Sequence, residues 1–134
     1  MFYKVNFDGA IFREMGATGL GVVIRDFKGI VIGALAEQIS LPNFVATVEA
    51  LACRRAVLFT KEKSIFEATF EGDVETVTNV LKDGGSNHPK FSHVINDSLV
   101  LFSDFCFCSF SHVRRLGNSI AHFLARKYKY GNEL

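Results

Sequence analysis

The stretch Lys4–Ala10 constrains the fold more than any other part of the chain. Its apolar residues Val5 and Phe7 alternate with polar neighbours, which is the period-two pattern of a strand with one buried face. The strand closes with Asp8, and Gly9 follows at once. A carboxylate at the end of a strand, beside a residue that lets the backbone turn, can point its charge into a site. Asp is also favoured in ordinary turns, so this stretch alone leaves a simple strand end as the alternative.

The remaining pattern predicts an α/β fold. Apolar runs at 22–25 and 30–36 flank a glycine-bearing turn and extend the first strand into an antiparallel meander. Helical spacing of Ala, Leu and Val predicts a long helix from 44 to about 63. Further elements are expected after it, with strands at 64–72 and 105–112 and helices at 74–81, 91–102 and 120–130. The order βββαβααβα predicts a five-stranded mixed sheet with helices on both faces.

Composition favours one folded domain over residues 1–134. The chain has 134 residues and a hydrophobic fraction of 49%, enough for a substantial core. Its net charge is +1, so any nucleic-acid surface has to be a local patch. We expect a monomer without a membrane span or signal peptide. The three cysteines lack the spacing of a disulfide framework, which fits an intracellular location in the nucleus or cytoplasm.

Three carboxylates are predicted to meet at one edge of the sheet. Asp8 ends the first strand, Glu49 lies on the long helix, and Asp73 follows the fourth strand. In a right-handed β-α-β crossover these strands can be neighbours with the helix over them. Considered one at a time, Glu49 fits the pattern of an ordinary helix-surface residue and Asp73 fits that of a helix N-cap. Together they would repel unless a cation sat among them, and their hard oxygens suit Mg²⁺ or Mn²⁺. Two such ions can support phosphodiester hydrolysis.

These acids belong to a series of short segments in a characteristic order. The segments are Asn6–Ala10, Gly19–Asp26, Glu49–Ala52, Glu71–Asp73 and Asn118–Ala125. Together they resemble a ribonuclease H domain, and specifically the ribonuclease H-like domains of plants that are related to non-LTR retrotransposon polyproteins. The resemblance runs from about residue 4 to residue 127, nearly the whole chain. Each segment alone is a weak signal, whereas five in the same order are specific.

The resemblance implies an endonuclease that hydrolyses the RNA strand of RNA–DNA hybrids with two Mg²⁺ ions. Its four metal-binding acids fall on Asp8, Glu49, Asp73 and the position of His122, where the active family has Asp. His112 falls where the family has a loop histidine that assists proton transfer or product release. The plainer alternative for His122 is a helix histidine without a ligand role. The plainer alternative for His112 is a structural or solvent-facing histidine.

His122 is the main departure from the family pattern. A neutral imidazole removes one negative charge from the site, and at an effective dielectric of about 20 a charge at ~4 Å is worth ~4 kcal/mol before solvation losses. Mg²⁺ prefers oxygen, whereas Mn²⁺ accepts imidazole more readily. We therefore predict a weakened second metal site and an activity that is lowered or biased toward Mn²⁺.

Basic residues near the predicted site are the candidates for contact with a hybrid. Arg114 and Arg115, with Asn118, are predicted to bind nucleic acid through its phosphates. Recognition should rest on backbone and 2′-hydroxyl contacts, not on base sequence. The alternative is a domain of retroelement origin, weakened or inactive in catalysis, that binds nucleic acid or protein without cleaving. A third hypothesis makes the chain part of a longer polyprotein.

Overall fold

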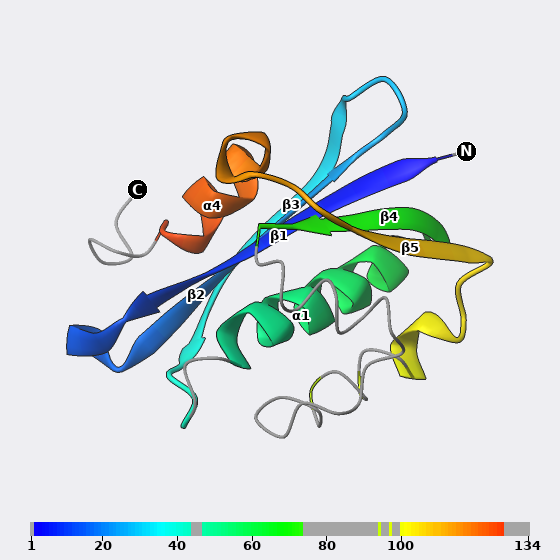
Figure 1. Ribbon diagram of the computed structural model, residues 1–134. Coiled ribbons are helices and arrows are strands. Elements are labelled where there is room, and N and C mark those ends of the chain that lie inside the picture. Colours follow the sequence, from blue (N-terminus) through cyan, green and yellow to red (C-terminus); the bar gives the residue numbers. More distant parts are fainter. Residues whose placement is uncertain (1, 44–46, 74–93, 95–96, 98–99, 128–134) are drawn as a thin grey trace.

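Three antiparallel strands form one side of the sheet in the computed structural model, which describes residues 2–43, 47–73, 94, 97 and 100–127. β1 (Tyr3–Phe12) pairs with β2 (Ala17–Arg25), and β2 pairs with β3 (Val31–Ser40). The short 3-10 helix η1 (Arg13–Met15) connects the first two strands (Figure 1). The predicted meander is confirmed, with longer strands than the apolar runs alone indicated.

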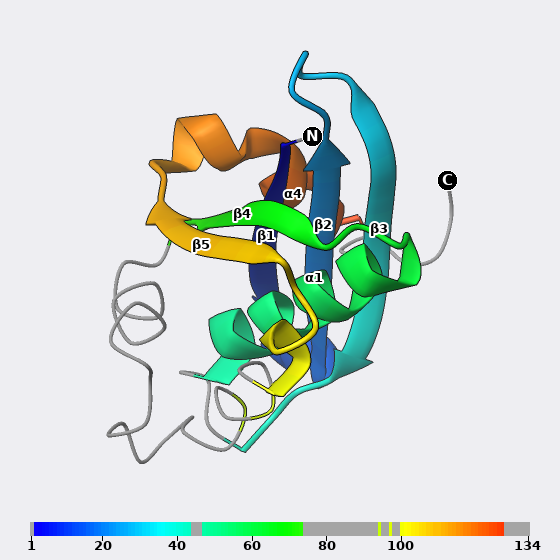
Figure 2. The same cartoon turned by 90° about the vertical axis from the view of Figure 1, so that its right-hand side faces the viewer.

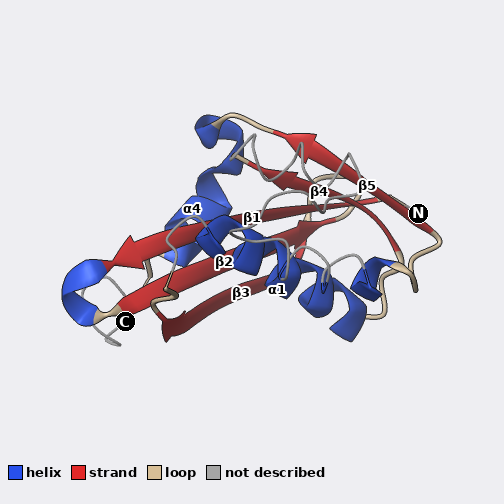
Figure 3. Cartoon of the chain, turned by 60° about the horizontal axis from the view of Figure 1, so that its bottom comes forward, coloured by secondary structure: helices blue, strands red, loops and turns tan. Residues whose placement is uncertain are grey.

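Two parallel strands complete the sheet on the other side of β1. β4 (Glu67–Gly72) pairs in parallel with β1, and β5 (Phe107–His112) pairs in parallel with β4. The strand order is β3-β2-β1-β4-β5, with β3 and β5 at the edges (Figure 3). The five-stranded mixed sheet predicted from the element order is therefore confirmed, and β1 lies at its centre.

The helix α1 (Val48–Glu62) packs on one face of the sheet. Its side chains at positions 48, 52, 53, 56 and 57 are buried, as a stripe at helical spacing should be. They meet Val5, Phe7 and Val22, which are almost fully buried on the sheet. The helix ends where Ser64 adopts a left-handed φ of 59°, so β4 begins at Glu67, later than the sequence predicted.

Phenylalanine rings fill the core beside β4 and β5. Phe70 is fully buried, and the centroid of its ring lies 5.7 Å from the ring centroid of Phe102 and 5.8 Å from the ring centroids of Phe105 and Phe110. These rings dock the segment 100–105 against the same face that α1 covers. The abundance of Phe in the sequence is thus explained by core packing, because a phenyl ring needs no buried hydrogen-bond partner.

The opposite face carries η3 (Arg115–Asn118) and α4 (Ser119–Ala125). Figure 2 shows α1 and α4 on either side of the sheet. Close packing of α4 on β2 requires two glycines: a Cβ at Gly19 would lie 1.8 Å from the carbonyl oxygen of Ala125, and one at Gly21 would lie 2.2 Å from that of Ala121. The contact brings the side chains of α4 over β1.

Some predicted elements fall wholly or partly outside the described residues. The helix at 74–81 lies outside them. Of the helix at 91–102, Val94, Asp97 and residues 100–102 are described and are helical. The final helix is described as far as Ala125, with residues 126 and 127 in a turn after it. No helix in the described part of the chain is long and apolar enough to span a membrane.

Candidate metal centre

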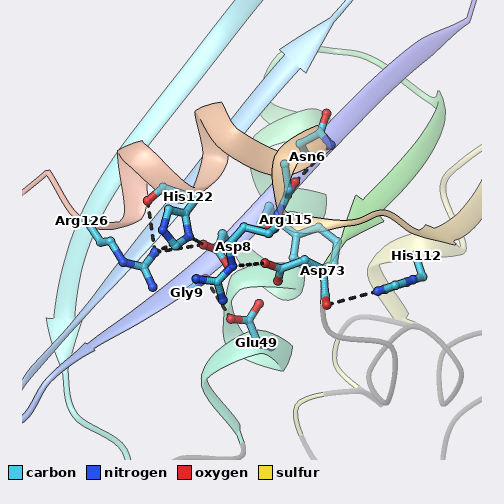
Figure 4. A network of polar contacts seen from close by, with 11 residues as sticks. Asn6, Asp8, Gly9, Glu49, Asp73, His112, Arg115, His122 and Arg126 are labelled. Carbon is cyan, nitrogen blue, oxygen red and sulfur yellow. Dashed lines mark hydrogen bonds and ion pairs between the residues drawn. The ribbon is translucent and has the colours of Figure 1, made fainter.

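The parallel pairing of β1 with β4 brings two of the predicted acids together. The register pairs Asn6 with Glu71, so Asp8 on β1 and Asp73, just past the end of β4, each lie two residues further along adjacent segments. Both side chains are buried, with 3% and 8% of their surface exposed. Figure 4 shows these carboxylates and that of Glu49 converging from β1, the end of β4 and the first turn of α1.

Glu49 reaches the pair because Gly9 allows α1 to approach β1 closely. A Cβ at Gly9 would lie 2.5 Å from a methyl carbon of Val48. The backbone N–H of Gly9 donates to Oε1 of Glu49 at 3.2 Å, which aims the carboxylate toward Asp8. The other oxygen, Oε2, is buried and has no hydrogen-bond partner among the residues that the structure describes. A buried carboxylate oxygen without a partner is costly, and a cation would satisfy it.

The electrostatics of the cluster also favour a cation. Burial, followed by the charges of Asp8 and Asp73, raises the pKa of Glu49 to about 9. Burial and the charge of Asp8 likewise raise the pKa of Asp73, against the lowering effects of Arg115 and His122. Both carboxyls thus hold a proton more tightly than usual, first because burial disfavours the ionised form and then because their neighbours are negative. A divalent ion would reverse this and return the cluster to its ionised form.

The edge of the cluster near β5 carries His112 and Arg115. His112 is the last residue of β5 and pairs with Gly72, and its Nε2 lies 3.2 Å from the backbone oxygen of Asp73. In the Nε2–H tautomer, the imidazole donates to that oxygen. Arg115 places Nε 3.6 Å from Oδ2 of Asp73. Both side chains are exposed, as is Arg114, so all three can reach a ligand on this surface.

The opposite edge is formed by α4. Nδ1 of His122 lies 2.9 Å from Oδ2 of Asp8. His122 is the residue predicted at the position of the fourth metal ligand. Arg126 joins them, with Nη1 3.1 Å from the same Asp8 oxygen and 2.7 Å from Nδ1 of His122. Arg126 was not among the predicted site residues. Its spacing of four residues from His122 was the available signal, because residues i and i+4 are neighbours on a helix surface.

Asn118 does not occupy the place that the prediction assigned to it. The side chain is only 1% exposed. Its Oδ1 accepts a hydrogen bond of 3.1 Å from Nδ2 of Asn6, and its Nδ2 donates to the backbone oxygen of Phe7 at 2.9 Å. Both functional atoms are therefore engaged within the protein. In the structure, Asn118 ties the start of α4 to β1 and does not offer its amide to a phosphate.

The residues present fit a divalent cation. Asp8, Asp73 and His122 each offer a ligand atom, and these atoms lie within 4.8 Å of one another. The unpartnered oxygen of Glu49 adds a further donor at the same cluster. Carboxylate oxygens with one imidazole suit a hard or borderline ion such as Mg²⁺ or Mn²⁺.

Comparison with solved structures shows the fold. RNase H1 from the halophilic archaeon Halobacterium salinarum NRC-1 superposes with a TM-score of 0.85 at 22% identity, covering 95% of this chain and 96% of that one. The N-terminal RNase H domain of a Mycobacterium tuberculosis protein gives 0.82 at 19% identity, over 94% and 91%. LC11-RNase H1, solved in complex with an RNA/DNA hybrid, gives 0.81 at 19% identity, over 93% and 94%.

Sequence comparison identifies the family. Curated protein sequences gave no match to this chain. A family model described as reverse transcriptase-like matches residues 6–128, which include every residue of the cluster described above. With the ribonuclease H fold of its structural relatives and a match over nearly its whole length, the chain belongs to the reverse transcriptase-like family.

Proposed function

We propose that this protein hydrolyses the RNA strand of RNA–DNA hybrids with divalent metal ions. The observation that carries the proposal is the convergence of Asp8, Glu49 and Asp73 from three separate elements, with one buried carboxylate oxygen left without a described partner. A folded chain gains nothing in stability from such a cluster unless a cation fills it. The structural likeness to LC11-RNase H1, which was solved with an RNA/DNA hybrid, supports the substrate class.

The three carboxylates would hold the cation, and His122 would provide the donor on the side of α4. Bound there, divalent ions supply an activated water and stabilise the leaving oxygen of a phosphodiester. Because the fourth donor is an imidazole, we propose a weaker second metal position and a preference for Mn²⁺ over Mg²⁺. His112, exposed at the end of β5, is placed to exchange a proton with the leaving group or to assist product release.

Hybrid binding is assigned to the exposed arginines beside the cluster. Arg114 and Arg115 lie between His112 and α4, and Arg115 already makes an ion pair with Asp73. Guanidinium groups suit bidentate contact with phosphate oxygens. Such contacts position the duplex without reading its sequence.

A second candidate function is hybrid or protein binding without cleavage. Two observations favour it: the imidazole in place of a fourth carboxylate, and the ion pair between Arg126 and Asp8 in the same cluster. Under either function we propose a single monomeric domain over residues 1–134 that acts inside the cell, in the nucleus or cytoplasm. The sequence resemblance supports a plant retroelement origin and a place within a longer polyprotein.

The test is cleavage of a labelled RNA–DNA hybrid with Mg²⁺ and, separately, with Mn²⁺. The parent is compared with Asp73→Asn and His122→Asp. The matched control is Asp104→Asn, which removes an exposed carboxylate paired with Lys61. We expect cleavage by the parent and the control, none by Asp73→Asn, and faster cleavage by His122→Asp. Cleavage by His122→Asp alone would instead indicate a scaffold disabled at one position. If neither the parent nor His122→Asp cleaves the hybrid while both proteins are folded, the nuclease proposal is refuted.

A further inference from the structure

Arg126 is held in a defined position by the end of α4. Its backbone N–H donates to the carbonyl oxygen of Phe123 at 3.1 Å, so it caps the last turn of the helix. Its side chain folds back, and Nη1 lies 3.2 Å from the backbone oxygen of His122. A positive group at a helix C-terminus is favoured by the helix dipole. The guanidinium is thus oriented before any ligand binds.

From this position Arg126 contacts the two atoms that would bind a cation on the α4 side, Oδ2 of Asp8 and Nδ1 of His122. One nitrogen, Nη1, lies within hydrogen-bond distance of both Oδ2 of Asp8 and Nδ1 of His122. When the proton of His122 is on Nε2, Nδ1 accepts from Arg126 and cannot bind a metal ion through the same lone pair. Figure 4 shows the guanidinium beside His122, on the side of Asp8 away from Asp73.

The opposite side of the cluster carries the acids that would hold a cation. Asp73 and Glu49 lie there, and Glu49 keeps an oxygen without a described partner. The arginine on that side, Arg115, has 69% of its side chain exposed and stays 3.6 Å from Asp73, so water screens its charge. Arg126, at 34% exposure and 3.1 Å from Asp8, is closer and better shielded from water.

We propose that Arg126 is a built-in cation that closes the α4 side of the centre, so that the protein binds one divalent ion and the guanidinium takes the place of a second. The inference rests on the proposed metal-dependent function and refines it: the second metal position, weakened by His122, stays unfilled while Arg126 supplies its charge. Three ionised carboxylates are balanced by one divalent ion and one guanidinium. A second divalent ion would leave an excess of positive charge, and a guanidinium cannot yield by losing its proton.

The experiment counts Mn²⁺ ions bound to the purified full chain at neutral pH, by isothermal titration calorimetry and by the electron paramagnetic resonance signal of free Mn²⁺. The main variant is Arg126→Met, which keeps much of the apolar stem and removes the charge and the donors. The matched control is Arg115→Met, which removes one positive charge from the other edge of the same cluster. Circular dichroism verifies that each variant is folded.

We expect the parent and Arg115→Met to bind one ion, and Arg126→Met to bind two. In the double variant Arg126→Met, His122→Ala the second ion should be lost again, because His122 is its ligand. If the parent binds two ions, this measurement alone overturns the inference. One ion bound by Arg126→Met, or two by Arg115→Met, would also overturn it.

These results are separable from the fate of the proposed function. If Arg126→Met gains a second ion while no protein cleaves a hybrid, the nuclease proposal fails and the inference about Arg126 stands. If the parent cleaves a hybrid and binds two ions, the nuclease proposal stands and Arg126 does not replace an ion. A parent that binds no Mn²⁺ would overturn the inference and the metal centre together.

Discussion

Replacing Glu49 with Gln should make the metal-free protein more stable at neutral pH. Burial and the charges of Asp8 and Asp73 raise the pKa of Glu49 from an ordinary value of 4.5 to about 9. At neutral pH the folded protein therefore carries a carboxyl that binds a proton, whereas the unfolded chain has released it. Gln has the same shape without the charge, and its carbonyl oxygen can still accept the hydrogen bond from Gly9.

The sign and the size of the effect follow from proton linkage. Between pH 4.5 and about 9 the folded state holds the extra proton, so the free energy of unfolding of the parent falls as pH rises across this window. Each pH unit is worth about 1.36 kcal/mol. At pH 7 the loss relative to pH 4.5 is at most about 3 kcal/mol. Glu49→Gln removes this slope, so its advantage should be small near pH 5 and larger at pH 8.

The assay is urea unfolding of the parent and of Glu49→Gln in EDTA, from pH 5 to pH 8. Glu62→Gln is the matched control, because that carboxylate lies on the same helix with 51% of its side chain exposed. We expect the control to stay within about 0.5 kcal/mol of the parent. The reasoning would be refuted by a Glu49→Gln variant that is no more stable than the parent, or whose advantage does not grow with pH. Added Mn²⁺ should reverse the order, because only the parent keeps the full ligand set.

Two further predictions concern how α4 is held over the site, and a third concerns the exposed arginines beside it. Gly21→Ala should cost about 3 kcal/mol of stability in urea unfolding and weaken Mn²⁺ binding, because its Cβ would lie 2.2 Å from a carbonyl oxygen of α4. Gly117→Ala, whose Cβ comes no closer than 3.9 Å to another atom, should cost far less, and equal losses would contradict this packing. Asn118→Ala should cost about 2 kcal/mol in the same assay, because it leaves two buried partners unsatisfied. Arg114→Ala should leave stability unchanged and weaken hybrid binding measured by fluorescence anisotropy. If Asn118→Ala instead kept its stability and lost hybrid binding, Asn118 would have the phosphate-binding role that its buried contacts argue against.

Residues close together in the sequence allowed most of the fold to be predicted. The alternation around Val5 and Phe7 and the helical spacing in α1 are local patterns, and each is confirmed. The pairing of β1 with β4 required only a rule for chain connections, and it set Asp8 beside Asp73. The boundaries were less accurate at the start of β4, which was predicted at residue 64 and lies at Glu67, because Ser64 adopts a left-handed conformation that has no strong sequence signal.

The less predictable residues are those whose roles depend on distant contacts. Asn118 was predicted to bind nucleic acid, yet its side chain bonds to Asn6 and to the backbone of Phe7, more than 100 residues earlier. Arg126 was one basic residue among several near the C-terminus, and only the docking of α4 brings it to Asp8. The residues that neighbour a polar side chain in the sequence do not indicate which distant group it will contact.

By itself, the sequence determined the order of the described strands and helices and the mixed sheet, and it singled out the three acids of the candidate centre. These depend on hydrophobic periodicity, which is a local property of the chain, and on general rules for how successive strands and helices connect. Only the tertiary structure decided that α4 lies against β2 at Gly19 and Gly21, that His122 and Arg126 share one oxygen of Asp8, and that burial raises the pKa of Glu49. Burial and charge coupling arise when distant segments exclude water together, so they are properties of the packed molecule.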